Sequence, residues 1–127
     1  MSSSEAMAMT EKLERAISVR QPYVEMILRG VKGAEYRSRP TRVRGRVYLY
    51  ASKSLGNVEA GVKAGVTLDA VEGLPRGAIV GSVEVIGCDW DARRECYAWK
   101  LARPVRYPQA LPFRGQPQPA FWRPVVA

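Results

Sequence analysis

Residues 16–53 read AISVRQPYVEMILRGVKGAEYRSRPTRVRGRVYLYASK and predict a strand, a short helix and two further strands. The apolar residues 16–19 favour the first strand. Pro22 suits the first position of a helix, because it lacks the amide that would be unpaired there. Apolar residues then follow the helical i, i+3, i+4 spacing until Gly30, which can adopt the left-handed conformation that ends a helix. We therefore predict a helix over residues 22–29.

The rest of the chain predicts mostly strands. Residues 35–38 and 46–51 are predicted strands. Residues 78–90 and 97–101 are predicted to form a hairpin around a charged turn. Residues 55–73 predict only two short, weak helices, because glycine lowers helix stability. These elements favour a small mixed, mainly antiparallel β-barrel of five to six strands with a few short helices, an α+β but mainly β class.

The two ends of the chain differ in composition from the middle. Residues 1–13 are polar and small, so we predict a flexible tail followed by a single domain over residues 14–127. Six of the nine prolines lie in residues 104–124, which predicts little regular structure there. We expect extended segments that pack across an open end of the barrel, with residues 121–122 as a short last strand.

The composition excludes several kinds of site. The chain has no histidine, which excludes Ser-His and Cys-His catalysis and histidine metal ligands. Its two cysteines cannot supply a four-ligand zinc site, and we expect no metal and no cofactor. The chain has no apolar run long enough for a membrane span and no signal-peptide pattern. We therefore expect a cytoplasmic monomer that does not enter a membrane.

The positive charge is concentrated in one segment. The whole chain has a net charge of +8, and residues 15–53 alone hold ten basic and two acidic residues. The remainder of the chain therefore sums to zero. A localised excess of this kind is typical of a protein that binds a polyanion.

The segment from Gly30 to Arg37 resembles the GxKxxExR signature of the ASCH domain, a relative of the PUA fold. Residues 18–23, SVRQPY, resemble the lead-in S-x-R-Q-P-[WY] of that family. Residues 50–53, YASK, resemble the end of the next strand in the family, with Tyr50 in place of the commoner histidine. Residues 112–122 are similar to its closing segment. The resemblance implies a PUA-like β-barrel with a cleft beside the signature loop.

The same resemblance implies a link to RNA. Some ASCH domains are hydrolases that remove the acyl group from N4-acetylcytidine nucleosides, and others have been associated with RNA cleavage. In the hydrolase branch the signature lysine is catalytic, and it corresponds to Lys32. The chain departs from that branch at Glu35, where the hydrolases have threonine. It also departs at residues 89–95, which predict a turn where the hydrolases need a helix with a glutamate.

We predict a basic cleft around the signature loop. Lys32 and Glu35 are the candidate catalytic residues, with Lys32 to handle the proton and Glu35 to orient water or the substrate. Arginine and lysine side chains match phosphate oxygens, and aromatic rings stack on bases. The remaining candidates for ligand binding are Arg20, Gln21, Tyr23, Arg37, Ser52, Lys53 and Trp99. Four arginines at positions 39, 42, 44 and 46 are predicted to flank the cleft and follow a phosphate backbone.

The sequence leaves three functions open. The first is a domain that binds RNA, a nucleoside or a nucleotide in the cleft. The second is an enzyme that uses the same cleft, either an amidohydrolase acting on an acylated base or a ribonuclease. Without histidine, RNA cleavage would need Lys32 and Glu35 as the acid–base pair or a metal held by carboxylates. The third is an interaction module that uses the proline-rich tail.

Overall fold

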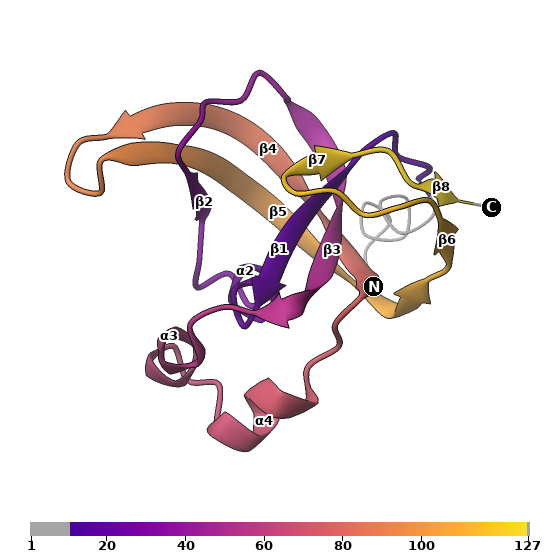
Figure 1. The fold of residues 1–127 in the computed structure, drawn as a ribbon, viewed down its shortest axis with the longest axis horizontal. Helices are drawn as coiled ribbons and strands as arrows, with labels where there is room; N and C mark the ends of the chain where they lie inside the picture. Colours follow the sequence, from indigo (N-terminus) through magenta and orange to yellow (C-terminus); the bar gives the residue numbers. More distant parts are fainter. Residues whose placement is uncertain (1–10, 127) are drawn as a thin grey trace.

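The computed structural model describes residues 11–126, which form a six-stranded sheet, a two-stranded sheet and three short helices (Figure 1). The elements in chain order are β1 (Ala16–Gln21), α2 (Tyr23–Leu28), β2 (Ala34–Arg37), β3 (Gly45–Leu55), α3 (Val58–Lys63), α4 (Leu68–Gly73), β4 (Ala78–Asp91), β5 (Cys96–Leu111), β6 (Phe113–Arg114), β7 (Phe121–Trp122) and β8 (Val125–Val126).

The large sheet has the strand order β2-β5-β4-β3-β1-β7 and curls into a half-barrel. Its pairs are antiparallel except for β1 and β3, which run parallel. The predicted mainly-β, mixed and mainly antiparallel fold is thereby confirmed. Strands β6 and β8 form the small sheet, and in Figure 1 the chain between them crosses in front of β1 and β3.

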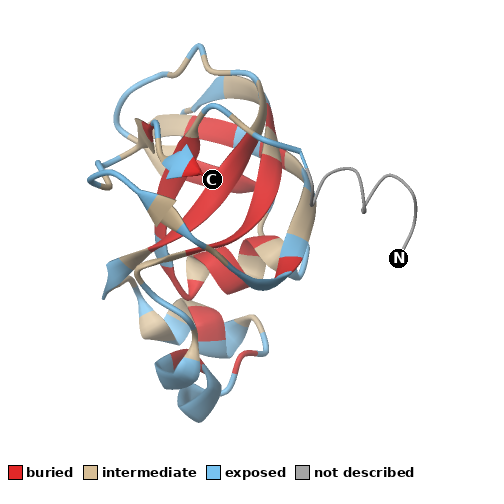
Figure 2. Cartoon of the chain, turned by 90° about the vertical axis from the view of Figure 1, so that its right-hand side faces the viewer, coloured by how far each residue is buried: buried red, intermediate tan, exposed pale blue. Residues whose placement is uncertain are grey.

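The core lies on both faces of the central strands, because alternate residues of β1 and β3 belong to two different buried clusters. Figure 2 shows the buried residues gathered on the central strands, whereas α3 and α4 carry many exposed residues. Ile17 and Leu49 are fully buried on the adjacent strands β1 and β3, and Val24 of α2 packs into the same cluster. Burying such side chains is the main favourable contribution to folding. Helix α2 is therefore fixed against the sheet, and the loop that follows it is fixed as well.

The two weak helices predicted between residues 55 and 73 are present as α3 and α4. Each begins at a polar side chain that accepts a backbone hydrogen bond. Asn57 Oδ1 accepts from the amide of Glu59 at 3.0 Å, and Thr67 Oγ1 accepts from the amide of Ala70 at 3.2 Å. Such caps satisfy amides that have no partner inside the helix, which stabilises short helices by about 1 kcal/mol.

The prediction of little regular structure from residue 104 onward was wrong for the first part of that segment. Strand β5 extends to Leu111 and contains Pro104 and Pro108. Both prolines fall where the pairing with β4 is irregular: Pro104 lies between Ala102 and Val105, and Pro108 lies between Arg106 and Leu111. A proline lacks the amide that a regular ladder needs, so it is tolerated at such irregularities.

The predicted flexible tail over residues 1–13 lies mostly outside the described residues, which begin at residue 11. Within the described part, the amide of Leu13 donates to Tyr48 Oη at 2.9 Å. Leu13 also packs against the second core cluster, which contains Tyr48 and Trp122. The chain is therefore attached to the core from Leu13 onward.

A buried carboxylate fixes α2 to strand β5. Glu25 is only 5% exposed, and it accepts two hydrogen bonds from Arg106 at 2.8 Å and one from Arg29 at 2.7 Å. Burial raises the pKa of Glu25, but the hydrogen bonds from Arg106 and Arg29 outweigh that effect and the pKa is lowered. The ionised carboxylate is thus favoured in the folded protein.

Substituting Glu25→Gln is expected to lower the free energy of unfolding at neutral pH by about 1–2 kcal/mol, because charge-assisted hydrogen bonds are lost. The loss is moderate because both arginine side chains are partly exposed to solvent. A lowered carboxyl pKa contributes stability above the ordinary glutamate pKa and loses it as the pH falls through the folded-state value. The difference between wild type and variant should therefore shrink in acid. Urea unfolding at neutral and acidic pH measures it, and a difference that grew in acid would contradict the assignment.

Candidate functional site

The principal pocket lies beside the loop between α2 and β2 and has a volume of about 740 Å³. Four basic side chains line it together with three tyrosines, three serines and one carboxylate. A volume of this size accommodates a ligand as large as a nucleotide. The lining residues are Ser18, Arg20, Tyr23, Lys32, Glu35, Tyr36, Arg37, Tyr50, Ser52, Lys53, Ser54, Gln116, Pro117, Gln118, Pro119 and Ala120.

Lys32 lies between aromatic rings at the end of the loop. Its side chain is 13% exposed, and Nζ lies 4.9 Å from the ring centre of Tyr23 and 4.8 Å from that of Tyr36. The nearest carboxylate oxygen, Glu35 Oε1, is 3.8 Å away. Burial lowers the pKa of Lys32 more than Glu35 raises it, and Arg94 and Arg37 lower it further. The amine therefore loses its proton more readily than an exposed lysine does.

Glu35 and Arg37 form an ion pair on strand β2. Arg37 Nε donates to Glu35 Oε2 at 2.8 Å, and Arg37 Nη2 donates to the carbonyl of Ser18 at 2.6 Å. The two residues lie two apart on a strand, so they share one face. The second contact joins β2, at one edge of the sheet, to β1 near the other edge. One oxygen of Glu35 is thus held by Arg37, while the other faces Lys32.

The wall opposite the loop is the segment from Gln116 to Ala120. Ser18 holds it at two points, since its Oγ donates to the carbonyl of Gln118 at 2.6 Å and its amide donates to the carbonyl of Ala120 at 2.8 Å. Trp122 Nε1 in turn donates to Ser18 Oγ at 2.9 Å. The hydroxyl group therefore donates one hydrogen bond and accepts one, and Ser18 positions the wall.

The position of Tyr23 depends on a close approach of the chain. A side-chain carbon added to Gly56 would lie 2.6 Å from Cε2 of Tyr23, and the amide of Gly56 donates to the carbonyl of Gln21 at 2.7 Å. The absence of a side chain at Gly56 thus leaves the space that the tyrosine ring occupies.

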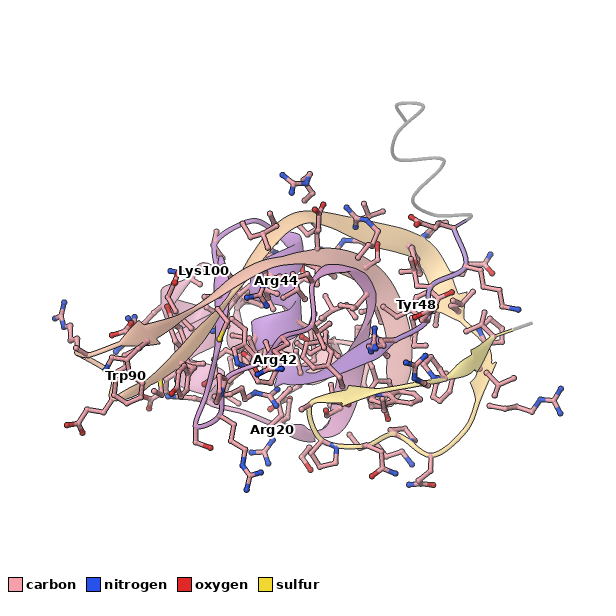
Figure 3. All side chains as sticks on the ribbon, turned by 90° about the horizontal axis from the view of Figure 1, so that it is seen from above. Arg20, Arg42, Arg44, Tyr48, Trp90 and Lys100 are labelled. Carbon is pink, nitrogen blue, oxygen red and sulfur yellow. The ribbon has the colours of Figure 1, made fainter. Side chains whose placement is uncertain are left out.

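The structure brings seven of the nine predicted site residues to the pocket: Arg20, Tyr23, Lys32, Glu35, Arg37, Ser52 and Lys53. Arg20 and Lys53 are exposed at its rim, whereas Glu35 is 8% exposed and lies deep in it. Figure 3 shows Arg20 below the labelled Arg42 in the view from above. Whether each residue binds a ligand or takes part in a reaction stays a prediction.

The other two predicted residues lie in the interior instead of the pocket lining. Gln21 is 1% exposed; its Nε2 donates to the carbonyl of Pro75 at 3.1 Å and its Oε1 accepts from the amide of Glu25 at 3.0 Å. Trp99 is 3% exposed and belongs to the core, where it stacks on Phe121 at 5.2 Å. Both side chains are used for packing and for hydrogen bonds within the fold.

The predicted flanking band of arginines also needs a correction. Arg46 donates to Ser82 Oγ at 2.8 Å and to the carbonyl of Arg103 at 2.9 Å, so it fastens neighbouring strands together. Arg44 donates to two carbonyls of its own loop. Arg39 and Arg42 are exposed and remain candidates for contact with a polyanion.

Sequence reasoning missed the tyrosines of strands β2 and β3, Tyr36 and Tyr50, as lining residues, and it missed the wall at residues 116–120. The sequence contains several aromatic residues, and nothing in it distinguishes those that line the pocket from those that lie in the core. The wall comes from the far end of the chain, and the pairing of β7 with β1 and the two hydrogen bonds from Ser18 bring it to the pocket. The proline-rich composition of that segment was the available signal, because it predicted an extended segment across an open end.

Among residues 11–126, no group of three or more histidine, cysteine, aspartate or glutamate side chains could hold a metal ion. Cys88 and Cys96 are both free thiols, each partly buried. In the same part of the chain, no helix has the length and apolar character needed to cross a membrane. The lining of the pocket offers amine, guanidinium, carboxylate, hydroxyl and aromatic groups.

A comparison with curated proteins found no match to the chain. A comparison with protein families found that residues 17–112 match the family model of the ASCH domain. The matched range includes the signature loop, strand β2 and most of the pocket, and it ends before the wall at residues 116–120. ASCH domains are PUA-like and generally associated with RNA, in agreement with the half-barrel and the basic pocket. On this match, which covers well over half of its length, the chain belongs to the ASCH domain family.

Proposed function

We propose that the protein binds RNA or a nucleotide, with one base and its phosphate held in the pocket. The observation that carries the proposal is the combination, in one pocket of about 740 Å³, of four basic side chains with three tyrosines. Phosphate oxygens are bound by arginine and lysine, and the rings offer stacking surface for a base. Neither feature alone separates a nucleotide from another anion or another aromatic ligand, but the combination fits a nucleotide.

The basic residues of the pocket differ in whether other protein groups already bind their side chains. Arg37 is engaged by Glu35 and by the carbonyl of Ser18, so it shapes the pocket. Arg20 and Lys53 are exposed at the rim, where they can reach a phosphate group. We therefore assign the phosphate contacts to Arg20 and Lys53 and the deeper contacts, to the base or sugar, to Lys32 and Tyr23.

The double variant Arg20→Ala, Lys53→Ala is expected to weaken binding of a short single-stranded RNA by about tenfold at moderate salt. Each lost phosphate contact should reduce the slope of log affinity against log salt by about 0.7. Fluorescence anisotropy with a labelled oligonucleotide over a salt series measures both quantities.

The matched control is Lys63→Ala, Arg114→Ala, which removes one lysine and one arginine that are exposed and do not line the pocket. It lowers the net charge by the same amount and should leave the slope close to that of the wild type. Equal losses in the two double variants would show that only net charge matters and would reject the assignment of the pocket. Affinity that does not depend on salt would reject it as well.

The Lys32–Glu35 pair supports a second candidate, hydrolysis of an amide on an acylated base. A partly buried amine with a lowered pKa can accept a proton near neutral pH more readily than an exposed lysine, and a carboxylate beside it can orient water. In this reaction water adds to the amide carbon, the C–N bond breaks, and a carboxylic acid and the free amine are released. The Arg37 contact on one oxygen of Glu35 leaves the oxygen that faces Lys32 for that role.

Incubation with N4-acetylcytidine and, separately, with a short RNA distinguishes these functions. A protein that only binds gives no cytidine and no shortened RNA, as measured by chromatography and gel electrophoresis. Cytidine that forms with the wild type and not with Lys32→Met would establish the hydrolase. Shortened RNA with the same dependence would establish a ribonuclease.

A further inference from the structure

Strands β4 and β5 continue beyond the half-barrel as a hairpin that projects past β2 (Figure 1). One row of side chains crosses three strands from the pocket to this hairpin. Arg37 of β2 is paired with Tyr97 of β5, and Tyr97 is paired with Trp90 of β4. No register shift interrupts either pairing at these positions. Paired residues point to the same face of a sheet, so all three lie on one face, and Arg37 is the member of the row that lines the pocket.

Trp90 is the exposed end of that row. It is 57% exposed, and its ring contacts Tyr97 edge-on with ring centres 5.1 Å apart. Figure 3 shows it near the end of the hairpin, away from the barrel. Neighbouring strands lie about 4.8 Å apart, so Trp90 lies on the order of 10 Å from the pocket residue Arg37. A large aromatic ring held in this way on a strand is a preformed stacking surface.

Two exposed arginines lie near Trp90, although the turn that carries one of them also holds the exposed Glu95. Arg93 is exposed in the hairpin turn, and Arg39 is exposed in the loop that follows β2. That loop lies beside the row, because the carbonyl of Arg39 accepts from Trp99 Nε1 at 2.9 Å. The carboxylates on either side of Trp90, at positions 89 and 91, point to the opposite face, since side chains alternate along a strand.

The hairpin turn contacts the pocket from a second direction. Arg94 lies with its guanidinium 4.3 Å from the ring centre of Tyr36, which lines the pocket and also contacts Lys32. Asp91 fixes Arg94 in place through hydrogen bonds of 2.9 and 3.0 Å. The hairpin turn therefore contacts the pocket lining through Arg94.

We propose that the surface formed by Trp90, Tyr97, Arg39 and Arg93 continues the pocket and binds a second nucleotide of a single-stranded RNA. The base of that nucleotide stacks on Trp90, and Arg39 and Arg93 contact its phosphate groups. This inference rests on the proposed function, because the first nucleotide occupies the pocket. It adds a substrate class: an RNA strand of at least two nucleotides in place of a free nucleoside.

The test compares a mononucleotide with short oligouridines and oligoadenines on the wild type and on Trp90→Ala. The wild type should bind an oligonucleotide more tightly than the mononucleotide. Trp90→Ala should weaken oligonucleotide binding by about 5- to 150-fold, the range for loss of one stacked base, and leave mononucleotide affinity unchanged. The control Ile86→Ala removes another exposed apolar side chain from the same strand and should change neither affinity.

Intrinsic fluorescence gives an independent readout. The chain has three tryptophans, and the other two, Trp99 and Trp122, are 3% and 6% exposed. A base stacked on Trp90 should quench the exposed component of the fluorescence, and the quenching should require an oligonucleotide. Trp90→Phe should keep most of the affinity because it keeps an aromatic ring, and it should lose the quenching.

The outcomes separate this inference from the proposed function. If the mononucleotide binds in the pocket but oligonucleotides bind no more tightly, the second site is rejected and the proposed function stands. If neither binds, both are rejected. If Trp90→Ala changes the oligomeric state in sedimentation measurements and leaves RNA affinity unchanged, Trp90 serves contacts between protein molecules and the inference is overturned.

Discussion

Lys32→Met is expected to weaken nucleotide binding at neutral pH by about tenfold without lowering the stability of the protein. The lost interaction is a charge-assisted contact in a partly desolvated pocket, for which about 1.5 kcal/mol is typical. The stability should not fall, because burial of the ammonium group disfavours its charged form in the folded state, as the lowered pKa of Lys32 records. Methionine has similar length and needs no hydration. Titration calorimetry and urea unfolding measure the two effects.

The pH dependence of binding identifies the same residue. Because the pKa of Lys32 is lowered, its positive charge disappears at a lower pH than that of an exposed lysine. Wild-type affinity should therefore fall as the pH rises from neutral toward alkaline values, and Lys32→Met should show a flatter profile. Lys53→Met is the matched control, since it removes an exposed lysine of the same pocket and leaves Lys32 intact. If the two lysine variants gave the same profile, Lys32 would have no special part in binding.

Gly81→Ala is expected to lower the free energy of unfolding by about 3 kcal/mol, with a fall in melting temperature of about 10 °C. Gly81 lies in the central strand β4 and is paired on both sides, with Leu49 of β3 and Arg106 of β5. A methyl group at this position would overlap the carbonyl oxygen of Val105, and it would lie 3.2 Å from Cδ2 of Leu28 in α2. Backbone atoms of a central strand cannot move aside without breaking the ladder.

Gly87→Ala provides the control for this prediction, because Gly87 lies in the same strand. A side-chain carbon there would meet Lys100 Cγ at 3.7 Å, an ordinary contact. Its cost should therefore be small, within about 1 kcal/mol of the wild type. Thermal unfolding followed by circular dichroism compares the two variants. Equal losses would mean that the close approach at Gly81 is not the cause.

Much of the site could be predicted because its residues are close in sequence. The turn from β1 into α2 and the stop at Gly30 are local signals, and they place Arg20 and Lys32 at the two ends of one helix. The alternation of a strand then places Glu35 and Arg37 on one face. Local geometry of this kind needs no knowledge of distant contacts.

Burial was the property that sequence reasoning predicted worst. Gln21 and Trp99 carry polar or aromatic groups of the kind that bind bases, and Arg20, the neighbour of Gln21, does line the pocket. The register of β5 against β2 turns Trp99 inward. The carbonyl of Pro75 accepts a hydrogen bond from the side-chain amide of Gln21. Each outcome depends on a partner that is distant in sequence, by 64 residues in one case and by 54 in the other.

The sequence by itself determined the class of fold, the order of most strands, the signature loop and the concentration of positive charge near it. These features follow from local periodicity, from glycine and proline conformation, and from composition. The tertiary structure alone decided the far wall at residues 116–120, the inward turn of Trp99 and the row that leads from Arg37 to Trp90. The reason is physical: pairing of strands far apart in the chain sets the register, and the register determines which face each side chain takes.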